Sequence, residues 1–303
     1  MKILVTGGTG FVGRQLVQDL LSQGHEVRLL TRQVVLREGV ETYHLFDIED
    51  EDSQRLAMQG VDVICHLAGR AHVMGPAPAN HEALFEKVNV DWTRRLAGLA
   101  FESGVRRFVF VSSIGAVGSS SEPGRPLTEQ TPCQPTTPYG LSKLKAEEAL
   151  RELALQHGRE WVIVRPPLVY GKGAPGNLDR LAKLIRTGLP LPLGAICNAR
   201  SLIHVANLSA ALQSCLQHPQ AAGHVFHVRD VRDYSTPDIL RGVAASKGRP
   251  ARFFKFPVPL LRFCARMTGQ GAVFEQLAGW LQVDDAAIRQ VLGFQPKTWP
   301  FEI

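Results

Sequence analysis

The stretch Gly7-Gly8-Thr9-Gly10-Phe11-Val12-Gly13 decides the fold of this 303-residue chain. It follows the apolar run Lys2–Thr6 and opens a helical pattern over Val12–Gln23, which makes a strand–turn–helix unit. Glycines in the spacing GxxGxxG allow a tight turn, close approach to a pyrophosphate and close packing of helix on strand. Free N–H groups at the helix start then hold phosphate oxygens. We expect a dinucleotide to bind at Gly7, Gly10, Phe11, Val12 and Gly13.

Apolar runs and helical patterns alternate along the first two-thirds of the chain. This alternation predicts an α/β fold, a doubly wound parallel sheet of the Rossmann type. The expected strands are Lys2–Thr6, Glu26–Thr31, Glu41–Leu45, Val61–Leu67, Arg107–Ser112 and Trp161–Arg165. The expected helices are Val12–Gln23, about Glu51–Met58, about His81–Ser103 and Tyr139–His157. We assign residues 1–165, with about 204–222, to a dinucleotide-binding domain.

Proline and glycine become frequent from about residue 166, which is typical of a binding region assembled from loops. We assign 166–203 and 223–303 to a smaller C-terminal α/β substrate-binding region. A helix over Asn207–Gln217 is expected to return to the first domain. Short strands are expected near 224–228 and 251–256, and helices over Tyr234–Ser246, Val258–Met267 and Asp284–Leu292.

The composition, 45% hydrophobic and 20% charged, is that of a globular protein and excludes a largely disordered chain. We interpret the net charge of +6 as spread thinly, which indicates an anionic ligand and no nucleic-acid partner. An apolar stripe runs through Pro257–Val283. A membrane-surface helix is one interpretation of it. We favour the other, helices packed over a ligand pocket, because soluble helices are commonly amphipathic.

No apolar signal region precedes the first strand, and no window of about 18 apolar residues could span a membrane. The five cysteines lack CxxC spacing. They are Cys65, Cys133, Cys197, Cys215 and Cys264. We therefore expect a cytoplasmic protein with reduced thiols and no metal cluster.

The second expected strand ends at Arg32, where an NAD site usually offers a carboxylate to the ribose. An arginine there pairs with a 2′-phosphate, which favours NADP(H); the alternative is a solvated surface arginine. Asp47 and Ile48 suit an adenine contact, the carboxylate accepting from the amine and Ile48 packing on the ring. Leu67-Ala68-Gly69 is small enough for the backbone to run beside the cofactor.

Tyr139 and Lys143 stand at i and i+4 of one helix, so both side chains lie on one face. We expect the lysine cation to lower the pKa of the phenol and to reach the nicotinamide ribose. Ser112 and Ser113 end a strand at the edge where open α/β sheets bind ligands. Together these groups predict hydride transfer at a carbinol carbon, with Tyr139 exchanging the hydroxyl proton and a serine orienting the oxygen.

These motifs resemble the extended short-chain dehydrogenase/reductases of the NAD-dependent epimerase/dehydratase type. The likeness spans nearly the whole chain and rests on GGTGFVG, Asp47-Ile48, HLAG at 66–69, the serine strand, Tyr139…Lys143, RPPLVYG at 165–171 and LGFQP at 292–296. It makes Ser113 the catalytic serine, with Ser112 as the fallback because the tyrosine of the usual SS-x-x-VYG is absent. It also assigns Asn89, Ser112, Pro166 and Leu168 to the cofactor site.

The resemblance implies a nucleotide-sugar substrate, in particular a UDP-sugar. Asn177 and Arg200 match the family positions that bind the diphosphate. Leu193 belongs to a stiff apolar loop, 189–194, which we expect against the uracil ring. The family also implies a homodimer packed through Leu84–Ser103 and Tyr139–His157.

The chain most resembles the subgroup of UDP-glucose 4-epimerase-like proteins that act in surface-polysaccharide synthesis. Arg32 favours 4-keto reduction of a UDP-linked acetamido-deoxy hexosulose with NADPH. The alternatives are a UDP-sugar 4-epimerase with retained NAD and, more remotely, a non-catalytic NAD(P)-sensing regulator. A dehydratase is disfavoured because Ile114-Gly115 follow Ser113 where that subfamily carries Asp-Glu.

Overall fold

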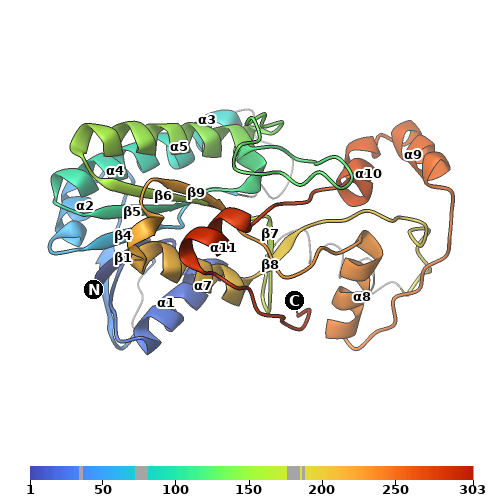
Figure 1. Cartoon of the computed structure of the whole chain (residues 1–303), viewed down its shortest axis with the longest axis horizontal. Helices are drawn as coiled ribbons and strands as arrows, with labels where there is room; N and C mark the ends of the chain where they lie inside the picture. The colour runs from blue at the N-terminus through green and yellow to red at the C-terminus, as the bar shows by residue number, and fades with distance from the viewer. Residues whose placement is uncertain (34–36, 72–80, 176–184, 186–187, 303) are drawn as a thin grey trace.

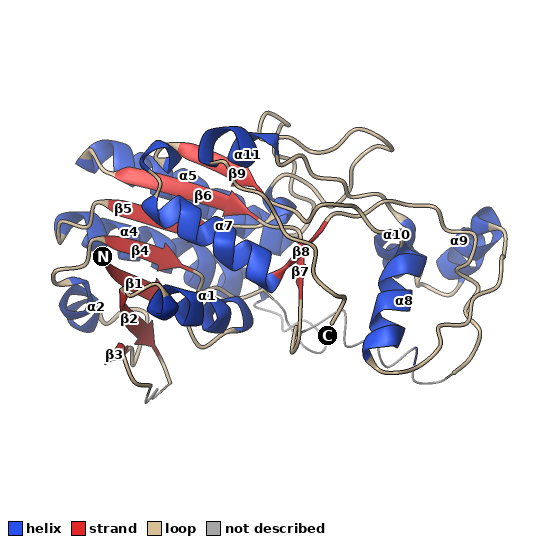
Figure 2. Ribbon diagram, turned by 60° about the horizontal axis from the view of Figure 1, so that its bottom comes forward, coloured by secondary structure: helices blue, strands red, loops and turns tan. Residues whose placement is uncertain are grey.

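A seven-stranded parallel sheet forms the centre of the larger part of the protein (Figures 1 and 2). The computed structural model describes residues 1–33, 37–71, 81–175, 185 and 188–302. The strand order is β3-β2-β1-β4-β5-β6-β9, and each neighbouring pair is parallel. The strands are β1 (Lys2–Thr6), β2 (Glu26–Thr31), β3 (Val40–His44), β4 (Val63–His66), β5 (Arg107–Val111), β6 (Glu160–Arg165) and β9 (His224–His227). This confirms the expected doubly wound fold.

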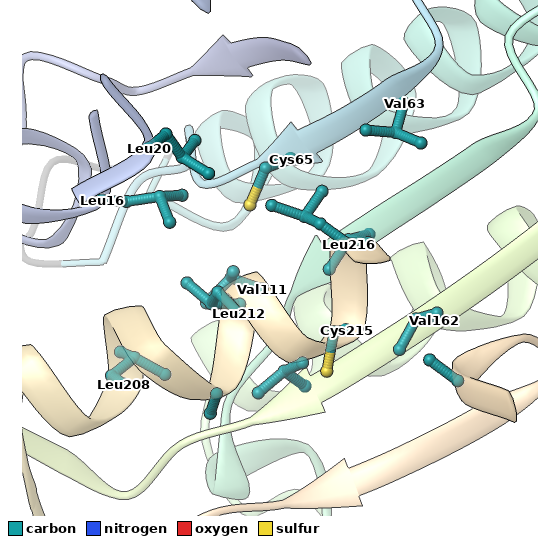
Figure 3. Close-up of a cluster of buried hydrophobic side chains, with 14 of the residues drawn as sticks. Leu16, Leu20, Val63, Cys65, Val111, Val162, Leu208, Leu212, Cys215 and Leu216 are labelled. Carbon is teal, nitrogen blue, oxygen red and sulfur yellow. The ribbon is translucent and has the colours of Figure 1, made fainter. Parts of the chain in front are cut away.

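Alternate side chains of each strand enter two separate cores, one on each face of the sheet. Val5 and Val109 pack with helices α1 (Phe11–Ser22), α7 (Val205–Gln217) and α11 (Ala286–Leu292). Figure 3 shows this core, in which Leu16 and Leu20 of α1 face Leu212 and Leu216 of α7. Leu4 and Phe108 point the other way, toward α2 (Glu51–Met58), α4 (Trp92–Glu102) and α5 (Pro138–His157). Burial on both faces is why the strands are continuous apolar runs.

The last strand and the last helix belong to the sheet layer, although the sequence assigned both to the substrate region. β9 extends the sheet beside β6, with Ile163 opposite Val225. Ile288 of α11 is fully buried in the core that holds α1 and α7. Three returns of the chain therefore complete the Rossmann part, namely α7, β9 and α11. The boundary at residue 223 stays a prediction, and the strand pairing and apolar burial of the sheet layer continue beyond it.

A smaller lobe lies beyond the carboxyl ends of the strands, to the right in Figures 1 and 2. The parallel pair β7 (Leu168–Tyr170) and β8 (Leu202–His204) stands at the junction. The lobe contains α8 (Thr236–Ser246), α9 (Val258–Met267) and α10 (Gly271–Ala278). The strand expected near 251–256 is absent there; an isolated bridge joins Phe253 to Leu191 instead. No helix in the described part of the chain is long and apolar enough to cross a membrane.

The helix expected over about His81–Ser103 is interrupted by a π-helical turn. It consists of α3 (His81–Phe85), the π-turn η1 (Glu86–Asp91) and α4. The π-turn contains Asn89, which is 1% exposed. A π-turn inserts an additional residue into the helical repeat, and such turns are frequent at functional sites. The apolar periodicity of residues 81–103 does not indicate this interruption.

Candidate active site

The glycine turn holds α1 against β1 and leaves the helix start open. Gly7 has φ +70°, and a Cβ there would lie 2.7 Å from the Ala68 amide nitrogen. A Cβ at Gly13 would lie 2.2 Å from the Gly7 carbonyl oxygen, so only glycine allows this approach. Gly10 is the N-cap of α1 and supplies no side-chain cap. The N–H groups of the first turn therefore remain available to an anion.

A cleft of about 500 Å³ opens beside this turn, at the carboxyl edge of β1, β2 and β4. Seven of the residues expected to bind the cofactor line it: Gly7, Gly10, Arg32, Ile48, Leu67, Ala68 and Gly69. The remaining lining residues were missed in the sequence: Thr9, Leu30, Thr31, Gln33, Leu45, Arg70, Ala71, Val88 and Trp92. The glycine cradle, the cleft and the cations at its rim fit a dinucleotide.

The cleft carries two arginines and no carboxylate among its described lining residues. Arg32 is exposed at its rim. Arg70 has a buried Nε with no hydrogen-bond partner in the described structure. Its position directly after HLAG is the one signal by which the sequence could have pointed to it. Both cations favour a ligand rich in phosphate.

Three of the expected cofactor residues contribute differently from the prediction. The Asp47 carboxylate is outside the cleft lining and accepts a hydrogen bond from the Glu49 N–H at 3.1 Å, so it caps a turn. The side chains of Phe11 and Val12 pack against the lobe core and the sheet core respectively. Only their backbone therefore faces the phosphate position.

Ser113 and Tyr139 meet at the end of β5. Ser113 is the N-cap of the short 3₁₀ turn η2 (Ile114–Ala116), and its Oγ accepts from the Gly115 N–H at 3.1 Å. Tyr139 lies in the first turn of α5, which Thr137 caps through the Gly140 N–H. The Ser113 hydroxyl lies near enough to the Tyr139 phenol to lower its pKa. The two sequence-predicted groups therefore form a contiguous pair that can share one substrate oxygen.

Lys143 lies under the same site, one helical turn after Tyr139. It is 3% exposed, and its Nζ donates to the Val111 carbonyl at 2.8 Å. The ammonium also lies 4.4 Å from the centre of the Phe110 ring. A Cβ at Gly69 would lie 3.4 Å from Nζ, so the glycine that lines the cleft also leaves room above the ammonium. Lys143 thus joins the cleft to the Ser113–Tyr139 pair.

The pKa values of this pair differ from the expectation. Burial raises the pKa of Tyr139 to about 12, and the hydrogen bond from Ser113 acts in the opposite direction. Burial lowers the pKa of Lys143 to about 8, whereas the negative charge of Glu147 raises it. Burial therefore sets the pKa of the phenol here, and the lowering expected from Lys143 is not among its causes. The apolar setting favours the neutral form of each group.

Ser112 faces a buried ion pair and not the cleft. Its hydroxyl donates to Glu147 Oε1 at 2.5 Å. Arg165 donates to both oxygens of the same carboxylate, at 2.9 and 2.6 Å. Glu147 and Arg165 are 0% and 2% exposed. The side chain of Ser112 is therefore unavailable as the fallback catalytic serine or as a cofactor ligand, and Ser113 remains the candidate.

Asn89 fastens the strand-end loop to α5. Its Oδ1 accepts from the Arg70 N–H at 2.8 Å, and its Nδ2 donates to the Arg70 carbonyl at 3.1 Å and to Ser142 Oγ at 2.9 Å. The π-turn orients this side chain inward. Asn89 therefore fixes the Arg70 backbone beside the cleft, and its own side chain is not part of the cleft lining.

The other predicted residues lie on the lobe side. The Pro166 carbonyl accepts from the Ile114 N–H at 3.0 Å, and Leu168 packs on the lobe core from β7. Leu193 is 8% exposed in that core, and its contact with a base stays a prediction. Arg200 is half-buried, donates to the Gly279 carbonyl at 3.0 Å and has no ion pair within the described residues. Asn177 lies outside the described residues.

Gly13→Ala should weaken dinucleotide binding because its Cβ would displace α1 from β1. We expect the Kd for NAD(P)+, measured by titration calorimetry, to rise at least about tenfold, a loss of about 1.4 kcal/mol. Gly98→Ala in α4 is the matched control, since a Cβ there meets nothing within 4 Å. Equal affinity in both variants would remove the glycine turn from the site.

Glu147→Gln tests whether the buried carboxylate keeps Lys143 charged. The loss of its charge lowers the pKa of Lys143 below about 8, so NAD(P)+ affinity should begin to fall at a lower pH than in the wild type. The other titratable groups near Lys143 are Tyr139 and His66. Burial and the charge of Lys143 lower the pKa of His66 to about 3, so His66 stays neutral in this range.

The same variant leaves Arg165 buried without its partner, which should cost about 3–5 kcal/mol of stability. Glu147→Gln with Arg165→Met should recover much of the thermal stability but keep the altered pH profile. The exposed neighbour variant Glu148→Gln is the control. An unchanged profile in Glu147→Gln would limit this network to a structural role.

Comparison with known proteins agrees with this geometry. The sequence profile of the NAD dependent epimerase/dehydratase family matches residues 3–228. UDP-glucose 4-epimerase of Vibrio cholerae is 36% identical over 297 residues, which cover 97% of this chain and 90% of that protein. The N-acetyl-alpha-D-glucosaminyl-diphospho-ditrans,octacis-undecaprenol 4-epimerase of Escherichia coli O157:H7 is 28% identical over 86% of this chain and 76% of its own.

Solved structures are similar over the whole chain. A short-chain dehydrogenase/reductase superfamily protein of Agrobacterium tumefaciens with bound NAD is 27% identical, with a TM-score of 0.77 over 99% of this chain and 94% of that one. UDP-glucose 4-epimerase of Thermus thermophilus with NAD shares the fold at 23% identity, with a TM-score of 0.79 over 100% and 96% of the two chains. The chain belongs to the NAD dependent epimerase/dehydratase family of extended short-chain dehydrogenase/reductases, as its motifs predict.

Proposed function

We propose that this enzyme is a nucleotide-sugar 4-epimerase that uses NAD(P) in the cleft beside the glycine turn. The observation that carries the proposal is the placement of Ser113 at the end of β5, next to the first turn of α5 that holds Tyr139, with Lys143 Nζ beside Gly69 of the dinucleotide cleft. The Vibrio cholerae relative supports the sugar chemistry, since its name is that of a UDP-glucose 4-epimerase.

Tyr139 exchanges the proton of the C4 hydroxyl. NAD(P) held beside the glycine turn would supply the hydride chemistry at C4, with removal from one face of the sugar carbon and return to the other. The phenolate oxygen of Tyr139 takes the hydroxyl proton as the hydride leaves and gives it back as the hydride returns. Ser113 Oγ orients the same oxygen. No net oxidant or reductant is consumed, because each proton and hydride that leaves is returned.

Lys143 supplies the positive charge on which the phenolate depends. Burial opposes both charged forms, so the phenolate needs a cation beside it when it forms, and we assign that role to Lys143, one turn along α5. Bound ligand that excludes water strengthens this attraction. Glu147, at i+4 on α5, keeps the ammonium protonated near neutral pH.

The lobe provides a diphosphate contact. Burial lowers the pKa of Arg200, whose guanidinium is largely desolvated and donates to a backbone carbonyl. A cation of this kind favours a bidentate phosphate contact. We place the diphosphate of a UDP-sugar there, with Asn177 as a second predicted contact. We place the base against the loop 189–194, in which Leu189 is 67% exposed and Leu193 is buried.

A second candidate is reduction of a 4-keto UDP-sugar in surface-polysaccharide synthesis. Arg32 favours it, since an exposed arginine at the rim of the cleft suits the 2′-phosphate of NADPH. A reductase would consume one NADPH per ketone reduced, whereas an epimerase would consume none. A homodimer packed through Leu84–Ser103 and α5 fits either function, and Leu155 of α5 is 84% exposed.

The decisive assay incubates the purified protein with UDP-GlcNAc or UDP-glucose and NAD+. We expect each substrate to interconvert with its C4 epimer, which chromatography would measure. No net NADH should form. Tyr139→Phe should lower kcat about 10²–10⁴-fold because it removes the proton carrier. Tyr43→Phe, which removes a phenol bonded to Glu41 outside the cleft lining, is the control. Full activity of Tyr139→Phe would refute the proton step.

Arg32→Ala separates the two functions through the cofactor. If Arg32 binds a 2′-phosphate, the variant should raise the Kd of NADP+ about tenfold and leave the Kd of NAD+ unchanged. Arg55→Ala, on α2 and paired with Glu102, is the control. An equal effect on both dinucleotides would remove the argument for NADPH and for reduction. The reductase would be favoured if the protein consumes NADPH with a UDP-4-keto sugar and does not interconvert the C4 epimers.

A further inference from the structure

The whole net charge of the chain comes from one segment of the lobe. Residues 247–274 contain six lysines and arginines and no aspartate or glutamate. The remainder of the chain has 28 basic residues against 28 acidic ones and is neutral. The positive charge is therefore concentrated, which corrects the interpretation that it is spread thinly. A cationic segment on an otherwise neutral protein indicates an anionic partner.

The same segment exposes an apolar helix face. In α9, Leu260, Phe263 and Met267 stand at i, i+3 and i+7, so they form one stripe. They are 46%, 60% and 73% exposed, and no residue of α9 is buried. The sequence predicted that these side chains pack over a ligand pocket. In the structure they are exposed instead. We call these three residues the α9 stripe.

The α9 stripe belongs to an ordered part of the lobe. Phe274 of α10 is 7% exposed, and Arg262 of α9 bonds Glu275 of α10 at 2.8 Å. Arg266 lies 3.9 Å from the same carboxylate. Arg252 and Lys255, just before α9, are exposed and have no ion pair within the described residues. Figure 1 shows α9 at the end of the molecule opposite α2 and the N-terminus, away from the sheet.

We propose that α9 docks this enzyme on the surface of an anionic lipid bilayer. The α9 stripe would enter the boundary between headgroups and acyl chains, with the helix in the plane of the membrane. Arg252, Lys255 and Arg266 would lie at the level of the anionic headgroups. The sheet and its cleft would remain outside the bilayer.

Other anionic partners satisfy only half of this chemistry. A nucleic acid binds lysine and arginine through phosphate but offers no apolar layer to leucine and methionine. A second copy would bring the basic segment 247–274 against another of the same charge. Electrostatic steering of a nucleotide-sugar needs the cations but not the apolar stripe. A bilayer with anionic headgroups accepts both the charge and the apolar side chains.

The test is co-sedimentation of the full-length protein with phosphatidylcholine vesicles, with and without phosphatidylglycerol. We expect binding to the anionic vesicles and little to the neutral ones, with a loss of binding as salt rises. Phe263→Ser with Met267→Ser, and separately Lys255→Glu with Arg266→Glu, should each lower the partition coefficient at least about tenfold.

The matched controls are Leu155→Ser, an exposed leucine of α5, and Arg125→Glu with Arg159→Glu, exposed arginines outside the lobe. They should bind vesicles like the wild type. Turnover of a soluble nucleotide-sugar and thermal stability should be unchanged in the α9 variants, so the result does not depend on the proposed activity. Equal binding to both kinds of vesicle, equal loss in the controls, or an effect on the KM for the nucleotide-sugar alone would overturn the proposal. Loss of self-association in the stripe variant without loss of vesicle binding would overturn it in favour of a second copy.

Discussion

The buried carboxylate of Glu147 is the constraint on which the active site depends. It ties α5 to β5 through Ser112 and to β6 through Arg165, all three groups being nearly inaccessible to water. Because a buried charge must be fully partnered, this contact fixes α5 relative to the strand ends. Ser113 follows Ser112 directly, and Tyr139 and Lys143 lie on the two turns of α5 before Glu147. The carboxylate therefore orients the reacting groups without touching the substrate position.

Local patterns in the sequence were sufficient to predict the sheet and to select the candidate catalytic groups. The glycine turn, the strand positions and the Tyr139…Lys143 spacing each depend on neighbours within a few residues. The role of Ser112 was not predictable in this way, because Glu147 and Arg165 reach it from elsewhere in the chain. The same applies to Leu193, which is apolar enough for a base contact or for the core. Packing against the rest of the lobe places Leu193 in the core.

The Rossmann part and the lobe differ in how they bury apolar surface. The sheet has two cores, one on each face, and its strands enter both. The lobe has one smaller core, which leaves α9 without a buried residue. Average composition cannot reveal this difference, since the chain is 45% hydrophobic as a whole. The difference is seen only when the burial and the charge of individual segments are compared.

The π-turn before α4 has a consequence for how this chain could change in evolution. It holds one residue more than an α-helical turn, and that residue sets the phase between Asn89 and the apolar face of α4. Each helical residue rotates the following side chains by about 100°. A single deletion in this segment would therefore turn either the asparagine or the core face of α4 away from its partners. Length variation among descendants should be confined to loops outside this helix.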